Sequence, residues 1–304
     1  MRVLRGDPGR WEAGGRHVVT VGVFDGVHRG HRHLIDRVRE AAAGSGVASG
    51  VVTFDRHPLE VLAPDRAPRI LTSLDHRLEL FAAAGVETVG VLPFEGRVQH
   101  LSPEEFAGVV LSEGIRARQV VTGEDFRFGR DRAGDVDALR RLGGLLGFEV
   151  EPMGLIDGPL SSTHIRGLIA AGEVAAAGAA LGRLFELRAL VVRGRGMGGR
   201  IGVPTANLDV PAGMAVPGRG VYAVWASAVG RRVPGVANVG VRPTFGGDRE
   251  VVEAHLIGFD EDLYGESIGL AFTARIRPER RFDGPDELVA QIHRDIEAAL
   301  DLLG

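Results

Sequence analysis

The chain of 304 residues contains no cysteine, and all 36 of its basic side chains are arginine because lysine is also absent. Without cysteine there can be no disulfide, no thiolate metal site and no cysteine nucleophile. Without lysine there can be no Schiff base, no pyridoxal phosphate anchor and no P-loop lysine. Any phosphate chemistry in this chain must therefore depend on arginine, histidine, backbone N–H groups and metal ions.

Long apolar runs and an excess of charge of one sign are missing as well. The 36 basic and 40 acidic side chains leave a net charge of −4, which gives no sign of a surface for nucleic acid or for an anionic membrane. Residues 1–15 lack the apolar core of a signal peptide, and no stretch approaches the roughly 18 to 20 apolar residues of a membrane span. We expect a cytoplasmic protein with no nucleic-acid partner and no membrane partner.

The first half of the chain alternates between short apolar runs and amphipathic segments. Its strand-like runs are residues 17–24, 50–54, 86–92, 118–122 and 148–153. The helical segments between them are residues 30–43, 74–84, 103–112 and 135–146. Strands that alternate with helices, and that are apolar throughout, predict an α/β domain whose parallel sheet is covered by helices on both faces.

The second half of the chain has a different pattern. Glycine- and proline-rich turns, with no helices, separate its strand-like runs at residues 187–192, 221–229, 233–239, 251–258 and 268–276. This pattern is typical of an antiparallel β-barrel or sandwich. A last helix is expected at residues 285–303, where apolar residues recur every four positions. The change follows a helical stretch at residues 165–181, so we expect two domains, residues 1–185 and 186–304.

A glycine- and histidine-containing segment, Gly22–His31 (GVFDGVHRGH), follows the first strand and opens a helix. Ligands of open parallel sheets bind at the carboxyl ends of the strands, and a helix N-terminus there offers unpaired N–H groups to an anion. Gly26 and Gly30 would let the backbone approach a phosphate closely. His28 and His31 could both donate to one phosphate group. The alternatives are two surface histidines or a pair of metal ligands.

A second candidate site lies in the second half. Residues 194–207 (GRGMGGRIGVPTAN) form a glycine-rich loop whose N–H groups could wrap phosphates, although a corner of a barrel would have the same composition. Thr205 and Asn207 are two residues apart and could offer oxygen ligands on one side, as suits Mg²⁺. Glu253 stands in the apolar run VVEAHLIGF, and is either a site carboxylate or the solvated edge of a strand.

These segments resemble a known family. The string GxFDGxHxGH is similar to the HxGH signature of the adenylyl- and cytidylyltransferases, and in its longer form to bacterial bifunctional riboflavin kinase/FAD synthetase. Further segments match that family in order over nearly the whole chain. They are Phe54–Pro58 (FDRHP), Gly123–Gly129 (GEDFRFG), Ser161–Arg166 (SSTHIR), Pro204–Asn207 (PTAN), Gly220–Ala223 (GVYA), Gly235–Phe245 (GVANVGVRPTF), Val252–Leu256 (VEAHL) and Asp262–Gly265 (DLYG).

The resemblance implies two reactions. A Rossmann-like nucleotidyltransferase domain would adenylate FMN to FAD with ATP, releasing pyrophosphate, with His28 and His31 as catalytic residues. Its ATP-binding residues would be Gly22, Phe24, Asp25, Gly26, Gly30, Ser162, Thr163 and Arg166. Its flavin-binding residues would be Phe54, His57, Asp125 and Phe126.

The barrel domain, by the same resemblance, would phosphorylate riboflavin to FMN with ATP. Glu253 would be the general base, and Mg²⁺ would be held by Thr205 and Asn207. Its ATP-binding residues would be Gly194, Gly196, Gly198, Gly202, Pro204, Thr205 and Asn207.

The sequence departs from the family at a few positions. Arg56 replaces a proline and puts the role of His57 in question, while Met197 and Gly199 replace loop arginines and Val203 replaces a phenylalanine. Two alternatives stay open: an adenylyltransferase for another substrate, such as a pantetheine or nicotinamide mononucleotide, and a flavin-binding regulator or single-activity homologue with one inactive domain. The PTAN and VEAHL segments argue against the former, because those substrates already carry a phosphate.

Overall fold

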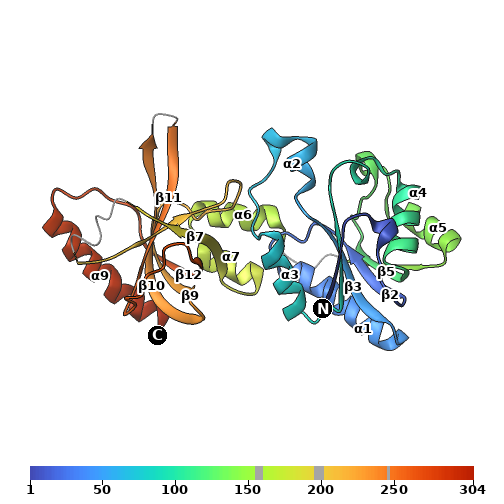
Figure 1. Ribbon diagram of the computed structural model, residues 1–304, viewed down its shortest axis with the longest axis horizontal. Coiled ribbons are helices and arrows are strands. Elements are labelled where there is room, and N and C mark those ends of the chain that lie inside the picture. Colours follow the sequence, from blue (N-terminus) through green and yellow to red (C-terminus); the bar gives the residue numbers. More distant parts are fainter. Residues whose placement is uncertain (155–159, 195–201, 245–246) are drawn as a thin grey trace. The chain divides into compact units, whose positions relative to one another are not determined.

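A computed structural model describes residues 1–154, 160–194, 202–244 and 247–304 (Figure 1). The chain divides into two compact units, Met1–Ser161 and Ser162–Gly304. The division falls between Ser161 and Ser162, before the helical stretch at residues 165–181 that we assigned to the first domain. The functional boundary at residues 185/186 therefore stays a prediction.

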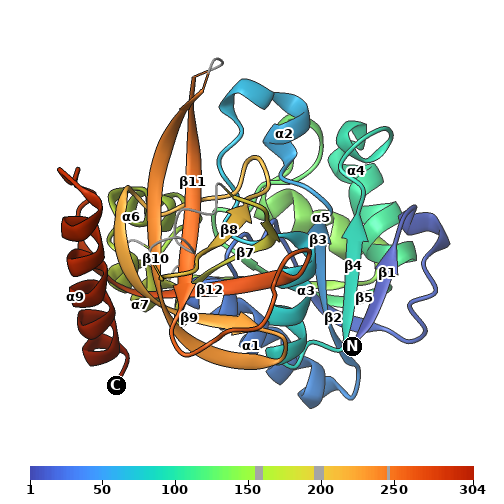
Figure 2. The same ribbon diagram turned by 60° about the vertical axis from the view of Figure 1, so that its left-hand side comes forward.

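The first unit contains a parallel sheet, as the alternation of strands and helices predicts. Its described strands follow the order β1-β4-β3-β2-β5-β6, and every neighbouring pair is parallel. The strands are β1 (Arg2–Arg5), β2 (His17–Val21), β3 (Ala48–Phe54), β4 (Thr88–Leu92), β5 (Ala117–Gly123) and β6 (Glu149–Met153). The sequence analysis did not predict β1, a four-residue strand at the sheet edge beside β4 (Figure 2).

Helices cover both faces of this sheet. On one face, α1 (Arg29–Ser45) and α3 (Leu74–Ala83) bury apolar side chains such as Ile35 and Phe81 against β3 and β4. On the other face lie α5 (Val136–Leu146) and a π-helical segment, η4 (Phe106–Gly114). The shorter helical elements are η1 (Pro8–Arg10), α2 (Pro58–Leu62), η2 (Pro64–Arg66), η3 (Val98–His100), α4 (Pro103–Glu105) and η5 (Arg130–Arg132).

The second unit contains a closed antiparallel barrel, which confirms the barrel expectation over the sandwich. Its described strands follow the order β10-β11-β8-β7-β12-β9, and β9 closes the ring by pairing with β10. The strands are β7 (Phe185–Val192), β8 (Ala206–Asp209), β9 (Gly220–Ala228), β10 (Arg231–Thr244), β11 (Gly247–Leu256) and β12 (Ser267–Arg277). The short, half-buried β8 was not predicted.

The predicted C-terminal helix is present as α9 (Pro285–Leu303). It lies against the outer face of the barrel (Figure 2) and contacts β9, β10 and β12. Ala299 packs there against Val221, Ala223 and Val236. The single helical stretch predicted at residues 165–181 is instead two helices, α6 (Ser162–Ala171) and α7 (Val174–Leu181). They separate at Gly172, whose φ of 81° is favourable only for glycine.

Candidate active sites

The loop between β2 and α1 has an unusual backbone. Phe24 and Val27 have φ values of 54° and 40°, and Gly26 has a φ of 83°. Positive φ is costly for a bulky residue and for a β-branched residue, and such strain tends to cluster at functional sites. The loop lies at the carboxyl end of β2, which is where the sequence predicts a phosphate-binding site.

His28 and His31 come together at the start of α1. Their rings stack with centroids 3.6 Å apart and an interplanar angle of 20°, and the His28 residue is only 5% exposed. His28 is the N-cap of α1, and its Nδ1 accepts the backbone N–H of His31 at 3.4 Å. A Cβ at position 30 would lie 3.1 Å from the His28 ring, which explains the glycine between the two histidines.

The protonation of this pair follows from its surroundings. Burial, and then the neighbouring His28 and Arg77, hold the pKa of His31 well below its usual value, so His31 is neutral near pH 7. Because Nδ1 of His28 accepts a hydrogen bond, the proton of a neutral His28 ring is on Nε2. The buried Nδ1 of His31 has no hydrogen-bond partner among the described residues. Both rings are therefore suited to donating to, or accepting from, a bound group.

Asp25 is engaged within the protein. Its side chain accepts the backbone N–H groups of Leu71 and Thr72 at 2.9 to 3.1 Å, and the residue is 3% exposed. The Thr72 hydroxyl in turn accepts the N–H of Gly26 at 3.0 Å. Asp25 thus connects the loop between β2 and α1, which we call the HxGH loop (residues 22–31), to the segment that precedes α3. This contact contributes to the shape of the loop.

The predicted flavin-binding residues of the Phe54–Pro58 segment lie at the carboxyl end of β3. The half-buried ring of Phe54 packs edge-on against Phe94, with centroids 5.3 Å apart. His57 caps α2, since its Nδ1 accepts the N–H of Leu59 at 3.2 Å in a reciprocal capping box with Glu60. The turn therefore forms without the family's proline.

Arg56, which stands at the position of that proline, is exposed. It forms ion pairs with Asp55 at 3.3 Å and with Glu95 at 3.4 Å.

The two other predicted flavin-binding residues lie on the turn after β5. Phe126 stacks on Phe128 at 5.6 Å with an interplanar angle of 10°, and Asp125 is exposed. The turn is closed by the N–H of Phe126, which donates to Gly123 at 3.1 Å. The parallel sheet thus places the carboxyl ends of β2, β3 and β5 side by side, where ligands of such sheets bind.

The predicted triphosphate ligands Ser162, Thr163 and Arg166 occupy the first turns of α6, within the second compact unit. Thr163 is exposed, while Ser162 and Arg166 are half-buried. Their role in the adenylyl site stays a prediction.

In the barrel, strand pairing brings the predicted catalytic groups together. Glu253 on β11 pairs with Asn207 on β8 and with Asn238 on β10, so the three residues form a row. Val252 and Ala254, the neighbours of Glu253, are buried in the barrel, and side chains alternate along a strand. The row therefore lies on the outer face, and all three of its residues are half-buried. Sequence reasoning missed Asn238, because only the pairing register places it beside Glu253.

The segment before β8 contacts residues in and beside the Asn207–Glu253–Asn238 row. Nδ1 of His255 lies 2.8 Å from the carbonyl oxygen of Pro204. A Cβ at position 194 would lie within 2.5 Å of the side-chain amide of Asn207, so the glycine is needed for this close approach. Gly202 has a φ of 76° with open space around it. Gly196 and Gly198, predicted to bind ATP, lie outside the described residues.

The described residues contain no cluster of three or more His, Asp or Glu side chains that could hold a metal ion. A magnesium site at Thr205 and Asn207 would therefore use one hydroxyl and one amide oxygen. Such a sparse set of neutral ligands suits Mg²⁺, which keeps several waters and binds substrate phosphates.

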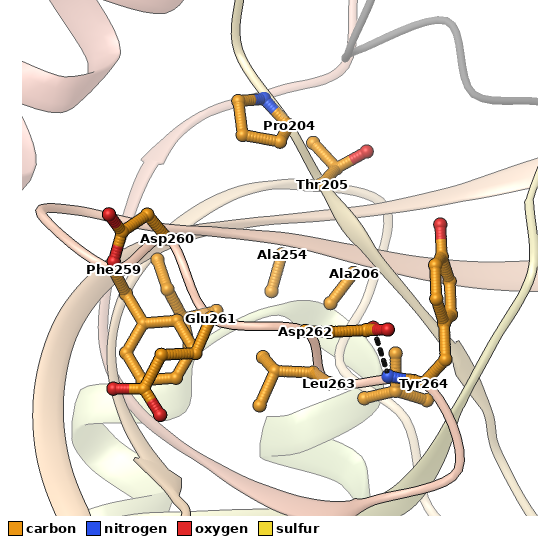
Figure 3. A pocket seen from close by; sticks show the side chains of 12 residues that line it. Pro204, Thr205, Ala206, Ala254, Phe259, Asp260, Glu261, Asp262, Leu263 and Tyr264 are labelled. Carbon is orange, nitrogen blue, oxygen red and sulfur yellow. Dashed lines mark hydrogen bonds between the residues drawn. The ribbon is translucent and has the colours of Figure 1, made fainter.

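A pocket of about 250 Å³ opens beside Thr205 (Figure 3). Asp262 accepts the N–H of Tyr264 at 2.9 Å on its rim, and the guanidinium of Arg193 lies 5.3 Å from the Tyr264 ring centroid. The apolar side chains of Ala206, Ala254 and Leu256 are among those that line it. The DLYG motif of the sequence therefore borders the same pocket as the PTAN motif, although about 60 residues separate them.

Comparison with known proteins identifies the family of each half of the chain. A family model described as FAD synthetase matches residues 12–163, and one described as riboflavin kinase matches residues 181–303. Bifunctional riboflavin kinase/FMN adenylyltransferases of Pseudomonas fluorescens, Escherichia coli K12 and Bacillus subtilis are 39%, 38% and 34% identical to this chain. The matches cover 93%, 94% and 94% of the chain and 91%, 93% and 92% of the relatives.

The fold and these matches together define a transferase with a nucleotidyltransferase domain and a kinase barrel. The chain belongs to the bifunctional riboflavin kinase/FMN adenylyltransferase family. A solved structure from Streptococcus pneumoniae, described as a macrolide-efflux protein, is also similar, with a TM-score of 0.89 and 29% identity over 98% of this chain and 99% of that one. Within its described residues, our structure has no helix of the length and apolarity needed to cross a membrane.

Proposed function

We propose that this chain makes FAD from riboflavin in two successive ATP-dependent steps, one at each site. ATP, riboflavin and FMN are then its small-molecule partners. The observation that supports this most strongly is the pair of independent constellations, the stacked histidines at the sheet edge and the Asn207–Glu253–Asn238 row on the barrel. The expected functional domains are residues 1–185 and 186–304. A cytoplasmic location, expected from the sequence, stays a prediction.

The barrel would carry out the first step. Glu253 takes the proton of the ribityl 5′-hydroxyl as the oxygen attacks the γ-phosphorus of ATP, and ADP leaves. Asn238 and Asn207, which flank Glu253, orient it and the phosphates. Thr205 and Asn207 would hold Mg²⁺, which when bound neutralises charge on the phosphates of ATP.

The sheet edge of the first unit would carry out the second step. A phosphate oxygen of FMN attacks the α-phosphorus of ATP, the bond to the bridging oxygen breaks, and pyrophosphate leaves. No base is needed, because a phosphomonoester with a second pKa near ~6 is mostly dianionic at pH 7. His28, His31 and the N-terminus of α1 would stabilise the charge that develops at the α-phosphate.

The roles of the remaining predicted residues follow from their chemistry. Arg166 can bind the β- and γ-phosphates through two N–H groups, with Ser162 and Thr163 beside it. Asp25 would act through the loop that it holds, since its carboxylate already accepts hydrogen bonds from Leu71 and Thr72.

The experiment that tests this function is incubation of the purified protein with riboflavin and MgATP, followed by chromatography of the flavins. We expect FMN to appear first and FAD to follow. FMN that accumulates without FAD would mean that only the kinase is active. An absence of any conversion would instead favour a flavin-binding regulator.

A further inference from the structure

Arg77, on α3, is a buried cation that no sequence motif identifies. The residue is 4% exposed. Its Nη1 donates to the carbonyl oxygen of Val23 at 2.5 Å and to the Thr53 hydroxyl at 3.3 Å, and its Nη2 donates to the carbonyl oxygen of Phe54 at 3.1 Å. Its Nε is buried without a hydrogen-bond partner among the described residues. Burying a guanidinium is costly, and more so when one N–H is unpaired, so a role beyond filling the core is indicated.

The acceptors of Arg77 share one location. Val23 lies just after β2, in the HxGH loop, and Phe54 is the last residue of β3, at the predicted flavin turn. The two strands are parallel neighbours. Thr53 completes the bridge, because its hydroxyl also donates to Val23 at 3.1 Å. One guanidinium therefore spans the two segments that would hold the two reacting substrates.

The charge of Arg77 also reaches the histidine pair. It adds to the effects of burial and of His28 that lower the pKa of His31. Burial lowers the pKa of Arg77 itself, against the opposing influence of Asp25, Glu60 and Asp55. With so little exposed surface, the guanidinium cannot be a ready ligand for substrate, and its influence must pass through the loops that it holds.

We propose that Arg77 is a positioning residue for the adenylyl step, which holds the HxGH loop and the Phe54 turn at the separation that the attack on the α-phosphate requires. This inference rests on the proposed function of the first unit. Misplacement of reacting groups by about 1 Å can cost about 10²-fold in rate. The bridge should therefore affect the rate of FAD formation more than the binding of either substrate.

The test compares Arg77→Met, which keeps the apolar stem, with Arg77→Lys, which keeps a charged donor. In the full-length protein, we expect Arg77→Met to lower kcat for FAD formation from FMN by about 30- to 100-fold. KM for ATP and for FMN should change by less than about threefold, and riboflavin phosphorylation should be unchanged. Arg77→Lys should recover at least about fivefold of the loss, since an ammonium can still donate to the carbonyl oxygens.

A matched control is Arg37→Met. Arg37, on α1, donates two hydrogen bonds to Glu151 at 2.6 and 3.0 Å. Within the described part of the chain its other ion pair is with Glu40, so none of these contacts reaches the HxGH loop. This variant should keep kcat within about twofold of the parent. Thermal melting of each variant gives its folded fraction at the assay temperature. A merely structural role of Arg77 would lower that fraction and leave kcat per folded molecule unchanged.

Two results would overturn the proposal: an Arg77→Met variant with kcat per folded molecule within threefold of the parent, or an Arg77→Lys variant that recovers nothing. If Arg77→Met does not fold, Thr53→Val removes the shared hydroxyl at nearly constant volume. It should lower kcat about three- to tenfold at an unchanged melting temperature, and an unchanged kcat would refute the bridge. A parent protein that makes no FAD from FMN would instead refute the proposed function.

Discussion

The two candidate sites are built in different ways. The adenylyl site depends on a strained loop, in which Phe24 and Val27 have positive φ and Asp25 is buried. Long-range hydrogen bonds hold that loop, such as the one from Leu71 to Asp25, 46 residues apart. The kinase site depends on the register of paired strands, which places Glu253 between Asn207 and Asn238.

This difference predicts how each site responds to substitution. A loop held by several distant partners loses its geometry when any of them is removed. The kinase row is placed by backbone pairing between barrel strands. The kinase site should therefore lose activity chiefly when a residue of the row itself is substituted. The following substitutions test this contrast.

The largest effect is expected for Glu253→Gln. Glutamine keeps the size of the side chain but cannot accept a proton near pH 7, and loss of a general base typically costs about 10²- to 10⁴-fold. The loss should appear in kcat for riboflavin phosphorylation more than in KM. Supplied FMN should still become FAD at the parental rate, as measured by chromatography. A variant that phosphorylates riboflavin as fast as the parent would remove Glu253 from the mechanism.

The next largest effect is expected for His28→Ala and His31→Ala. Loss of one preorganised donor typically costs about 10²- to 10³-fold in kcat, here for FAD formation from FMN. Riboflavin phosphorylation, measured in the same sample, should stay within about twofold of the parent. An equal loss of both activities would indicate a folding defect, and stoichiometric zinc in the purified protein would support the metal-pair alternative.

A smaller effect is expected for Asp25→Asn. Asparagine keeps one acceptor oxygen, but its NH2 group replaces the second oxygen and cannot accept the N–H of Leu71 there. A buried donor that meets another donor is unsatisfied, which costs about 1 to 3 kcal/mol. We expect a lower melting temperature and an approximately tenfold lower rate of FAD formation. Thermal melting and the two product assays check this. Unchanged FAD formation would show that the loop does not depend on this contact.

Much of the fold could be predicted from the sequence, because apolar periodicity and turn residues report directly on burial. The predicted strands and helices are present, apart from differences at their ends, the break at Gly172 and the predicted helix at residues 103–112, which is a short α4 followed by the π-helical η4. The strands β1 and β8 were missed because they are four residues long and carry too few apolar side chains to show a pattern. Their pairing with longer neighbours is what makes them strands.

The candidate sites were predictable where they depend on local motifs. His28 and His31 meet because they are three residues apart on one helix start, and Thr205 and Asn207 stand in one motif. Asn238 and Arg77 were missed because their positions depend on contacts between segments distant in sequence. An arginine in an amphipathic helix usually faces solvent, so nothing local distinguishes Arg77.

The most direct test of two independent sites is complementation between Glu253→Gln and His28→Ala. Each variant alone, given riboflavin and MgATP, should make almost no FAD, because one lacks the kinase base and the other lacks a donor for the adenylyl step. An equimolar mixture should make FAD, since FMN released by the His28→Ala protein can be adenylated by the Glu253→Gln protein. A mixture that makes no more FAD than the separate variants would contradict the account of two sites that work separately.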